Sequence, residues 1–263
     1  MKGMTGTTLA LLTLLATAAA RAQPEADLVL PFTLEAGLPV LQARIDGREA
    51  RLLIDAGGAA ALALRPDWSP VPAEAGAVST QDAQGQLRPQ ARIAVSTVLL
   101  AGQALPVAPA AQTWGKAKRP AGTDGYLGWG WLRERRWVID YAAGQLLRLA
   151  PGSAWPAGCG GAPLPLEMKG SLPVVRLQAA EGQALVLGLD TGASRNVIQP
   201  ALSAAVAGPL QASDGRPLAA GAFVSVPLQV PGLDGFLGQD FFSRHRVCVD
   251  PERREWRVQP LGG

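Results

Sequence analysis

The sequence predicts an all-β fold made of two homologous, closed, barrel-like lobes related by pseudo-twofold symmetry. Three observations support this prediction: the chain is rich in turn formers, its apolar residues occur in short blocks, and two sequence blocks occur twice in the same order. Gly (31) and Pro (22) make up about a fifth of the 263 residues, which favours short strands and turns over long helices. The 48% hydrophobic content is typical of a globular chain and excludes wholesale disorder.

The repeated blocks indicate duplicated structural units. The first block covers residues 37–57 and 171–192, and both copies contain Leu-Pro-Val, a strand, a Gly turn, a second apolar strand and Asp-x-Gly. The second block covers residues 124–140 and 234–250 at a constant offset of 110. Because both blocks recur in the same order, the sequence predicts two homologous halves.

The predicted organisation has four parts. A signal peptide covers residues 1–22, an N-terminal lobe residues 23–150, a linker residues 151–162, and a C-terminal lobe residues 163–263. The linker is assigned on its many Gly and Pro residues. Helical pattern is weak, and short helices are expected at three stretches: Trp129–Arg136, Gln199–Val206 and Gln239–His245.

The N-terminal segment is typical of a secretory signal peptide. Lys2 supplies a positive charge, Leu9–Ala20 is apolar, and Ala20-Arg21-Ala22 is a small-x-small cleavage site. An uncleaved anchor is the alternative, but the apolar run is shorter than the ~20 residues that a membrane span needs. The 24 basic and 21 acidic residues give a net charge of +3, and removal of Lys2 and Arg21 leaves +1. We therefore expect a periplasmic or secreted protein with no stable membrane insertion and no nucleic-acid partner.

The His and Cys content restricts the possible chemistry. One His and two Cys cannot assemble a four-ligand His/Cys zinc site, and we expect neither a metal nor another cofactor. Serine or cysteine hydrolase chemistry would have to be built on His245. The G-x-S-x-G nucleophile motif is absent from the sequence.

Each half carries one Asp at the end of an apolar strand, directly before a Gly turn. These residues are Asp55 with Gly57 and Asp190 with Gly192. Gly lets the backbone turn back sharply, so each carboxylate is expected at a loop tip. A pseudo-twofold axis would bring the two together, and carboxylates a few ångströms apart share one proton. Such a dyad can activate a water with one member and protonate a carbonyl oxygen with the other.

An Asp-Thr/Ser-Gly turn followed by two apolar residues and Gly resembles the aspartic proteases, and most closely their retropepsin-like branch. The matching residues are Asp55-Ala56-Gly57 with Tyr126-Leu127-Gly128, and Asp190-Thr191-Gly192-Ala193-Ser194 with Phe236-Leu237-Gly238. The resemblance implies the two-lobed aspartic protease fold, with Asp55 and Asp190 as catalytic residues. It also implies that each apolar-apolar-Gly segment packs behind its Asp turn. Retropepsins use two identical chains, whereas this chain carries both halves covalently, so we expect a monomer.

The first lobe departs from the family pattern at two positions. In the family, the Thr or Ser after each Asp bonds to the opposite lobe, which Thr191 can do and Ala56 cannot. Ser194 matches a position whose hydroxyl often supports the catalytic Asp, but its counterpart is Ala59. Because hydrogen-bond donors lower a carboxyl pKa, our hypothesis is that the first-lobe Asp holds the shared proton and the second-lobe Asp is ionised.

Turn chemistry indicates one flap candidate in each lobe. The candidates are Gln84 and Gly85 in lobe one and Asp214 and Gly215 in lobe two, because Asp-Gly favours tight hairpins and Gln-Gly does so more weakly. The Asp turn and the later Gly are 73 residues apart in lobe one and 48 in lobe two. A single flap is therefore expected in lobe one, and an ordinary surface hairpin is the alternative for both.

The two cysteines and the single histidine have simpler interpretations. Two cysteines in an exported protein favour a disulfide between Cys159 and Cys248, with two separate thiols as the alternative. His245 corresponds to Arg135 in the repeat and is expected at the surface. Core packing is expected for three Trp residues, with a substrate groove as the alternative: Trp129, Trp131 and Trp137. The mixed-sign runs are expected on solvated faces and turns; they cover residues 133–136 and 252–255.

The leading functional prediction is an exported aspartic endopeptidase that acts on polypeptide substrates. The alternative is a catalytically silent relative that binds peptide or another ligand between the lobes, because such a protein would also lose hydroxyls from one lobe. A third class, a structural envelope β protein, would leave the paired Asp turns unexplained.

Overall fold

The structure, a computed structural model, describes residues 26–68, 74–81, 86–105, 110–113, 122–179 and 181–261. The predicted signal peptide lies outside these residues. None of the described helices is long and apolar enough to cross a membrane.

The N-terminal half is built almost entirely of strands. In chain order they are β1 (Ala26–Glu35), β2 (Leu38–Ile45), β3 (Arg48–Asp55), β4 (Leu62–Leu64), β5 (Glu74–Gln81), β6 (Leu87–Ala94), β7 (Val98–Leu100), β8 (Gln103–Ala104), β9 (Ala110–Thr113), β10 (Gly125–Gly128), β11 (Trp137–Asp140) and β12 (Gln145–Leu149). The short helix α1 (Trp129–Leu132) lies between β10 and β11.

The C-terminal half follows a similar plan. Its strands are β13 (Leu164–Pro165), β14 (Glu167–Lys169), β15 (Leu172–Gln178), β16 (Ala184–Leu189), β17 (Asn196–Ile198), β18 (Leu210–Gln211), β19 (Pro217–Leu218), β20 (Phe223–Ser225), β21 (Gly235–Leu237), β22 (His245–Asp250) and β23 (Glu255–Pro260). Its helical segments are the 3-10 turn η1 (Pro200–Leu202) and the helix α2 (Gln239–Phe242). Both α1 and α2 begin where predicted but end earlier, because turns lead directly into β11 and β22.

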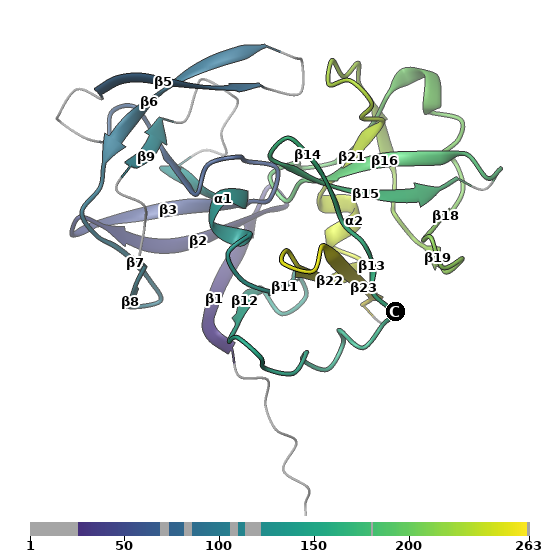
Figure 1. The fold of residues 1–263 in the computed structure, drawn as a ribbon, viewed down its shortest axis with the longest axis horizontal. Coiled ribbons are helices and arrows are strands. Elements are labelled where there is room, and N and C mark those ends of the chain that lie inside the picture. Colours follow the sequence, from purple (N-terminus) through teal and green to yellow (C-terminus); the bar gives the residue numbers. More distant parts are fainter. Residues whose placement is uncertain are drawn as a thin grey trace, which may run out of the picture.

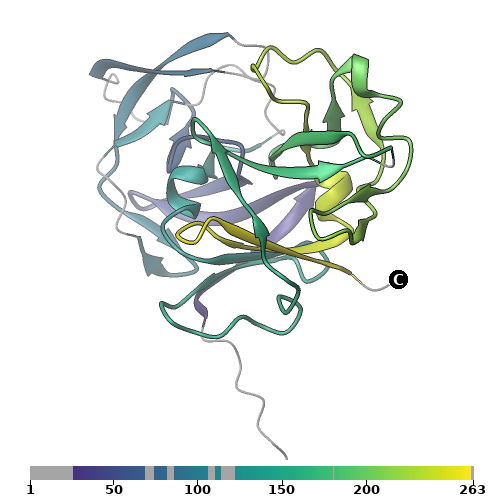
Figure 2. The same cartoon turned by 45° about the vertical axis from the view of Figure 1, so that its right-hand side comes forward.

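The strands form two lobes that stand on a shared sheet (Figures 1 and 2). An 8-stranded sheet with the order β19-β18-β15-β16-β21-β17-β20, to which β14 is added, forms the second lobe. A 15-stranded sheet contains the first lobe and, continuous with it, the order β13-β23-β22-β11-β12-β1. This last part takes strands from both halves, and the pictures show it beneath the two lobes. The predicted all-β, two-lobed architecture is confirmed, while the boundaries of the halves stay a prediction.

The pairing of β11 with β22 marks the approximate symmetry axis of the molecule. The two strands are antiparallel, with Val138 opposite Cys248. These residues are also counterparts in the repeat at the offset of 110. An antiparallel pair of equivalent residues is related by a local twofold axis, so the axis of the duplication passes through this pair.

The linker is tied to the shared sheet next to this axis. Cys159 of the linker forms a disulfide with Cys248 of β22, with their Cα atoms 6.0 Å apart. Arg246 of β22 donates a hydrogen bond to the carbonyl of Ala157 at 2.8 Å and forms an ion pair with Asp140 of β11. The two cysteines therefore form a disulfide rather than two separate thiols. The disulfide attaches the linker to the shared sheet near the junction of the halves.

The core is continuous between the lobes. The Trp129, Trp131 and Trp137 side chains are buried in it, as predicted, together with Phe241 and Phe242 of α2. Burial of such large aromatic surfaces dominates core energetics. This shared core fixes the orientation of the strands that carry the two Asp turns.

The prediction that His245 lies at the surface is wrong. Its side chain is fully buried and stacks on Phe241 with the ring centroids 4.4 Å apart. Its Nδ1 lies 3.0 Å from the Phe241 carbonyl oxygen, and burial lowers the pKa of the imidazole. The repeat matched it to Arg135, which is exposed; the difference arises because α2 packs over the start of β22.

Candidate active site

The two Asp turns end the same local substructure in both lobes. In lobe one, β3 ends at Asp55 and β10 runs parallel beside it, with Gly128 opposite Asp55. In lobe two, β16 ends directly before Asp190 and runs parallel to β21. The backbone N–H of Asp190 donates to the carbonyl of Leu237 at 3.0 Å. Each apolar-apolar-Gly segment therefore lies beside the strand that carries its Asp.

The predicted support residues of these segments are buried behind the turns. Leu127 and Leu237 belong to the common core. Neither Gly128 nor Gly238 has room for a side chain. A Cβ atom at Gly128 would lie 2.3 Å from the carbonyl oxygen of Ala60, and one at Gly238 would lie 2.3 Å from the carbonyl oxygen of Arg195. Close backbone approach therefore explains why both segments end in Gly.

The two carboxyl groups meet at the lobe interface. A Cβ atom added to Gly57 would lie 2.7 Å from Cγ of Asp190, and one added to Gly192 would lie 2.7 Å from Cγ of Asp55. A hydrogen bond joins the Asp55 and Asp190 side chains. Each Gly turn therefore packs against the carboxyl group of the opposite lobe, and the predicted pairing of the two residues is present.

The surroundings of the pair disfavour two negative charges. Burial raises the pKa of Asp55 well above its usual range, and the charge of Asp190 raises it further. Burial also raises the pKa of Asp190, but the hydrogen bond from Asp55 and N–H groups of its own turn oppose that rise. Because two adjacent carboxylates repel each other, the pair holds one proton. It titrates as a unit.

A single side chain makes the predicted cross-lobe bond. The Thr191 hydroxyl donates to the carbonyl of Ile54 at 2.7 Å and accepts from the N–H of Ala56 at 2.9 Å. Thr191 is fully buried. Ala56 has no hydroxyl with which to return these bonds, so one side chain satisfies two buried backbone groups that flank Asp55.

Ser194 does not act as the family pattern implies. Its side chain is exposed, and no hydrogen bond joins it to Asp190 in the described part of the chain. The N–H of Gly192 donates to the Asp190 carboxylate at 2.9 Å instead. Backbone groups from residues 57 and 58 act on Asp55 in the same way. The exchange of Ser194 for Ala59 between the lobes therefore does not change which groups donate hydrogen bonds to the two Asp residues.

A duplicated carboxylate network behind the turns was missed by the sequence analysis. The Asp124 side chain accepts from the N–H of Arg51 at 2.9 Å, and the Asp234 side chain accepts from the N–H of Val186 at 2.7 Å. These two acceptors begin the second repeated block, and the two donors are equivalent residues of β3 and β16. The conserved spacing within both copies of the repeat was the signal that could have identified this network.

The flap candidates have different surroundings. In lobe one, β5 and β6 form a long antiparallel hairpin that extends along the top of the lobe toward lobe two (Figures 1 and 2). Gln84 and Gly85 lie outside the described residues. Asp214 and Gly215 lie in a short turn between β18 and β19, at the outer edge of the second sheet. Arg216 pairs with Asp214 there, as in an ordinary surface hairpin.

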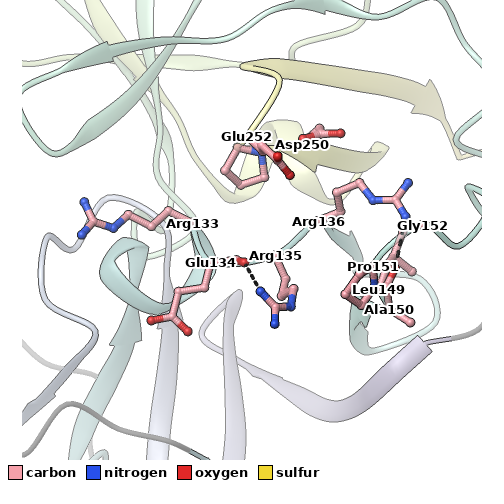
Figure 3. Close-up of a pocket in the computed structure, with 11 residues that line it drawn as sticks. Arg133, Glu134, Arg135, Arg136, Leu149, Ala150, Pro151, Gly152, Asp250 and Glu252 are labelled. Atoms are coloured by element: carbon pink, nitrogen blue, oxygen red, sulfur yellow. Dashed lines mark hydrogen bonds between the residues drawn. The ribbon is translucent and has the colours of Figure 1, made fainter.

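Figure 3 shows a pocket lined by charged residues of both signs, from the turn after α1, the end of β12 and the turn after β22. It is lined by residues 133–136, 149–152 and 250–252, none of which belongs to an Asp turn. Arg133 and Glu134 are exposed, in agreement with the prediction of a solvated face. No cluster of three or more His, Cys, Asp or Glu side chains is arranged as metal ligands among the described residues.

Comparisons with known proteins show the fold. No family model matches the chain, and no curated protein sequence matches it. An aspartic proteinase from Irpex lacteus is similar in structure, with a TM-score of 0.64, 13% identity, and coverage of 88% of this chain and 96% of that one. Basic 7S globulin from soybean is similar with a TM-score of 0.63, 12% identity, and coverage of 90% and 96%. The chain therefore has the two-lobed aspartic proteinase fold.

Proposed function

We propose that the chain is an aspartic-type endopeptidase that hydrolyses peptide bonds with a water held between Asp55 and Asp190. The observation that carries the proposal is the contact of the two carboxyl groups at the lobe interface. Their raised pKa values support a singly protonated pair, which is the form that this chemistry needs.

The chemistry follows from the single shared proton. The ionised carboxyl accepts a proton from the water as its oxygen attacks the peptide carbonyl carbon, and the protonated carboxyl donates to the carbonyl oxygen. Collapse of the resulting diol breaks the C–N bond, and the proton taken from the water passes to the departing nitrogen. The hypothesis assigns the proton to Asp55 in the resting pair, and the raised pKa of both carboxyls supports a single shared proton.

The finer features of the enzyme belong to the same proposal. We propose that each lobe is retropepsin-like and that one chain forms the whole site as a monomer. The β5–β6 hairpin is proposed as the flap, supported by its length and direction. Export to the periplasm or beyond is proposed from residues 1–22, and the disulfide supports an oxidising compartment.

A second candidate is a catalytically silent protein that binds peptide or another ligand between the lobes. The absent hydroxyl at Ala56, which leaves the cross-lobe bond one-sided, favours it. The names of the two similar structures, a proteinase and a globulin, support neither candidate over the other.

Hydrolysis of an unfolded protein substrate between pH 2 and pH 8 tests the proposal. We expect cleavage by the purified chain and a loss of at least ~10³-fold in kcat/KM for Asp55→Asn and for Asp190→Asn, because each change removes a proton-transfer group. Asp67→Asn is the matched control, since that Asp side chain is 72% exposed and lies outside the site.

The outcomes separate the two candidates. Absence of cleavage by correctly folded protein over the whole pH range rejects the peptidase. Binding of a statine-type transition-state mimic by such a protein, measured by calorimetry and lost in both Asn variants, would then support the silent binder. Equal activity of the Asn variants and the wild type would reject the role of the dyad.

A further inference from the structure

We propose that Tyr126 is a positioning residue that holds the turn after Asp55 and keeps the Asp55 carboxyl group in place. The inference rests on the proposed role of the dyad and adds a residue to it. Tyr126 lies in the middle of β10, opposite Leu53 of β3 and Ala63 of β4. Its side chain is 8% exposed.

The Tyr126 ring packs directly on the Asp55 turn. A Cβ atom added to Gly58 would lie 2.4 Å from Cε2 of the ring, and one added to Gly128 would lie 2.8 Å from the same atom. Real side chains do not approach so closely, so Gly58 is required here by the ring. The ring therefore packs against the turn at Gly58, three residues after Asp55.

The equivalent ring in lobe two lies against a different glycine. Phe236 takes the place of Tyr126, and a Cβ atom added to Gly188 would lie 2.8 Å from Cδ1 of that ring. The residue that corresponds to Gly58 in lobe two is Ala193, so no space is made for a ring on the Asp190 turn. The glycine that makes space for the ring is therefore on the turn in lobe one and on the strand in lobe two.

The hydroxyl group adds a polar contact that Phe236 cannot make. The backbone of Ala60 forms a hydrogen bond with the Tyr126 hydroxyl. Burial, and then the nearby charge of Asp55, raise the pKa of Tyr126, so the hydroxyl stays protonated over the working range of the dyad. Tyr126 therefore holds the turn at two points, Gly58 through its ring and Ala60 through its oxygen.

One of these two points, Gly58, is itself among the groups that act on Asp55. The backbone N–H of Gly58 donates to the backbone carbonyl of Asp55 at 3.0 Å, and the backbone groups of Gly57 and Gly58 lower the pKa of the Asp55 carboxyl against the effect of burial. A turn that is free to move would hold these donors less well, and the ionised carboxylate would lose stabilisation. Tyr126 thus supplies from within lobe one a constraint that the missing hydroxyl of Ala56 does not supply.

The test is Tyr126→Phe, which removes one oxygen and introduces the residue that lobe two carries. We expect the first ionisation of the dyad, followed by carbon-13 NMR of Asp carboxyls, to move up by about half to one pH unit, since a hydrogen bond that supports the donors is lost. We expect kcat to fall about 3- to 10-fold at unchanged KM. Tyr141→Phe is the matched control, because its buried hydroxyl has no hydrogen-bond partner among the described residues.

Each result bears on the proposal. A dyad titration that Tyr126→Phe leaves unchanged, or that Tyr141→Phe shifts equally, overturns it. The titration does not depend on hydrolysis, so an inactive wild type would reject the peptidase and still leave the role of Tyr126 measurable. Amide exchange in the unaltered protein is the second measurement: we expect the Ala60 N–H to exchange slowly, and exchange as fast as that of an open loop overturns the proposal.

Discussion

The turn after Asp190 carries a side chain that reaches the opposite lobe, whereas the turn after Asp55 carries none and is covered by a ring from its own lobe. Thr191 reaches across to Ile54 and Ala56, while on the other side the Tyr126 ring covers Gly58. The strands, the Gly turns and the buried Asp acceptors behind them are nevertheless duplicated. The comparison shows that the backbone geometry of the two turns was retained while the side chains that support it diverged.

The largest expected effect tests what the two turns still share. Gly57→Ala and Gly192→Ala should each lower kcat/KM at least ~100-fold, because the new methyl group would lie 2.7 Å from Cγ of the opposite Asp and would displace the reacting groups. Neither Gly has a positive φ, so both variants should fold. The control is Gly160→Ala, where nothing lies within 4 Å of the added atom. Loss of activity in one variant but not in the other would break the equivalence of the turns.

The next effect concerns the one-sided cross-lobe bond. Thr191→Val should lower the free energy of unfolding by about 1–3 kcal/mol, because it leaves the buried carbonyl of Ile54 and the N–H of Ala56 without their partner. Ala56→Ser, which offers a second hydroxyl, should change it by less than about 1 kcal/mol. Chemical denaturation measures both. A Thr191→Val variant as stable as the wild type would mean that this bond does not hold the lobes together.

The third effect uses the raised pKa of the first-lobe Asp. A carboxyl whose pKa is raised by folding stabilises the folded state below its unfolded value, here near 3.8, and loses that contribution as the pH rises through the folded value. Asn cannot ionise, so the Asp55→Asn variant does not lose stability as the pH rises. Its melting temperature should exceed that of the wild type by about 2–4 °C at pH 7 and match it near pH 3.

The same measurement on Asp190→Asn sharpens the comparison of the lobes. It should give a rise in the same direction, because burial raises the pKa of both carboxyls, and a smaller one, because the hydrogen bond from Asp55 opposes the rise at Asp190. Asp67→Asn, on an exposed side chain, is the control. A larger rise for Asp190→Asn than for Asp55→Asn would reverse the assignment of the shared proton.

The smallest effect is expected at Ser194. Because its side chain is exposed and makes no hydrogen bond to Asp190 in the described structure, Ser194→Ala should change the free energy of unfolding by less than about 0.5 kcal/mol. The acidic limb of the pH–rate profile should stay in place. A clear upward shift of that limb would restore the supporting role that the family resemblance implies for this hydroxyl.

Much of the candidate site could be predicted because its determinants are local in the chain. The Asp-x-Gly turns and the apolar-apolar-Gly segments are contiguous motifs, and their repetition predicts a twofold arrangement without knowledge of any long-range contact. That arrangement is observed in the pairing of Val138 with Cys248 and in the meeting of Asp55 with Asp190.

Features set by packing could not be predicted in this way. His245 has charged sequence neighbours and an exposed counterpart, yet Phe241 of α2 covers it. The cysteines were left with two alternatives until the fold brought their Cα atoms to 6.0 Å. The glycine that leaves space for the Tyr126 ring lies on a turn, whereas the one that leaves space for the Phe236 ring lies on a strand.

The order of residues alone was enough for the all-β class, the two lobes and the two Asp turns, because strand pattern and turn formation depend on near neighbours. Tertiary structure decided which side chains support each turn and which groups are buried. Those properties depend on distances between segments far apart in the chain and on how much water the packing excludes.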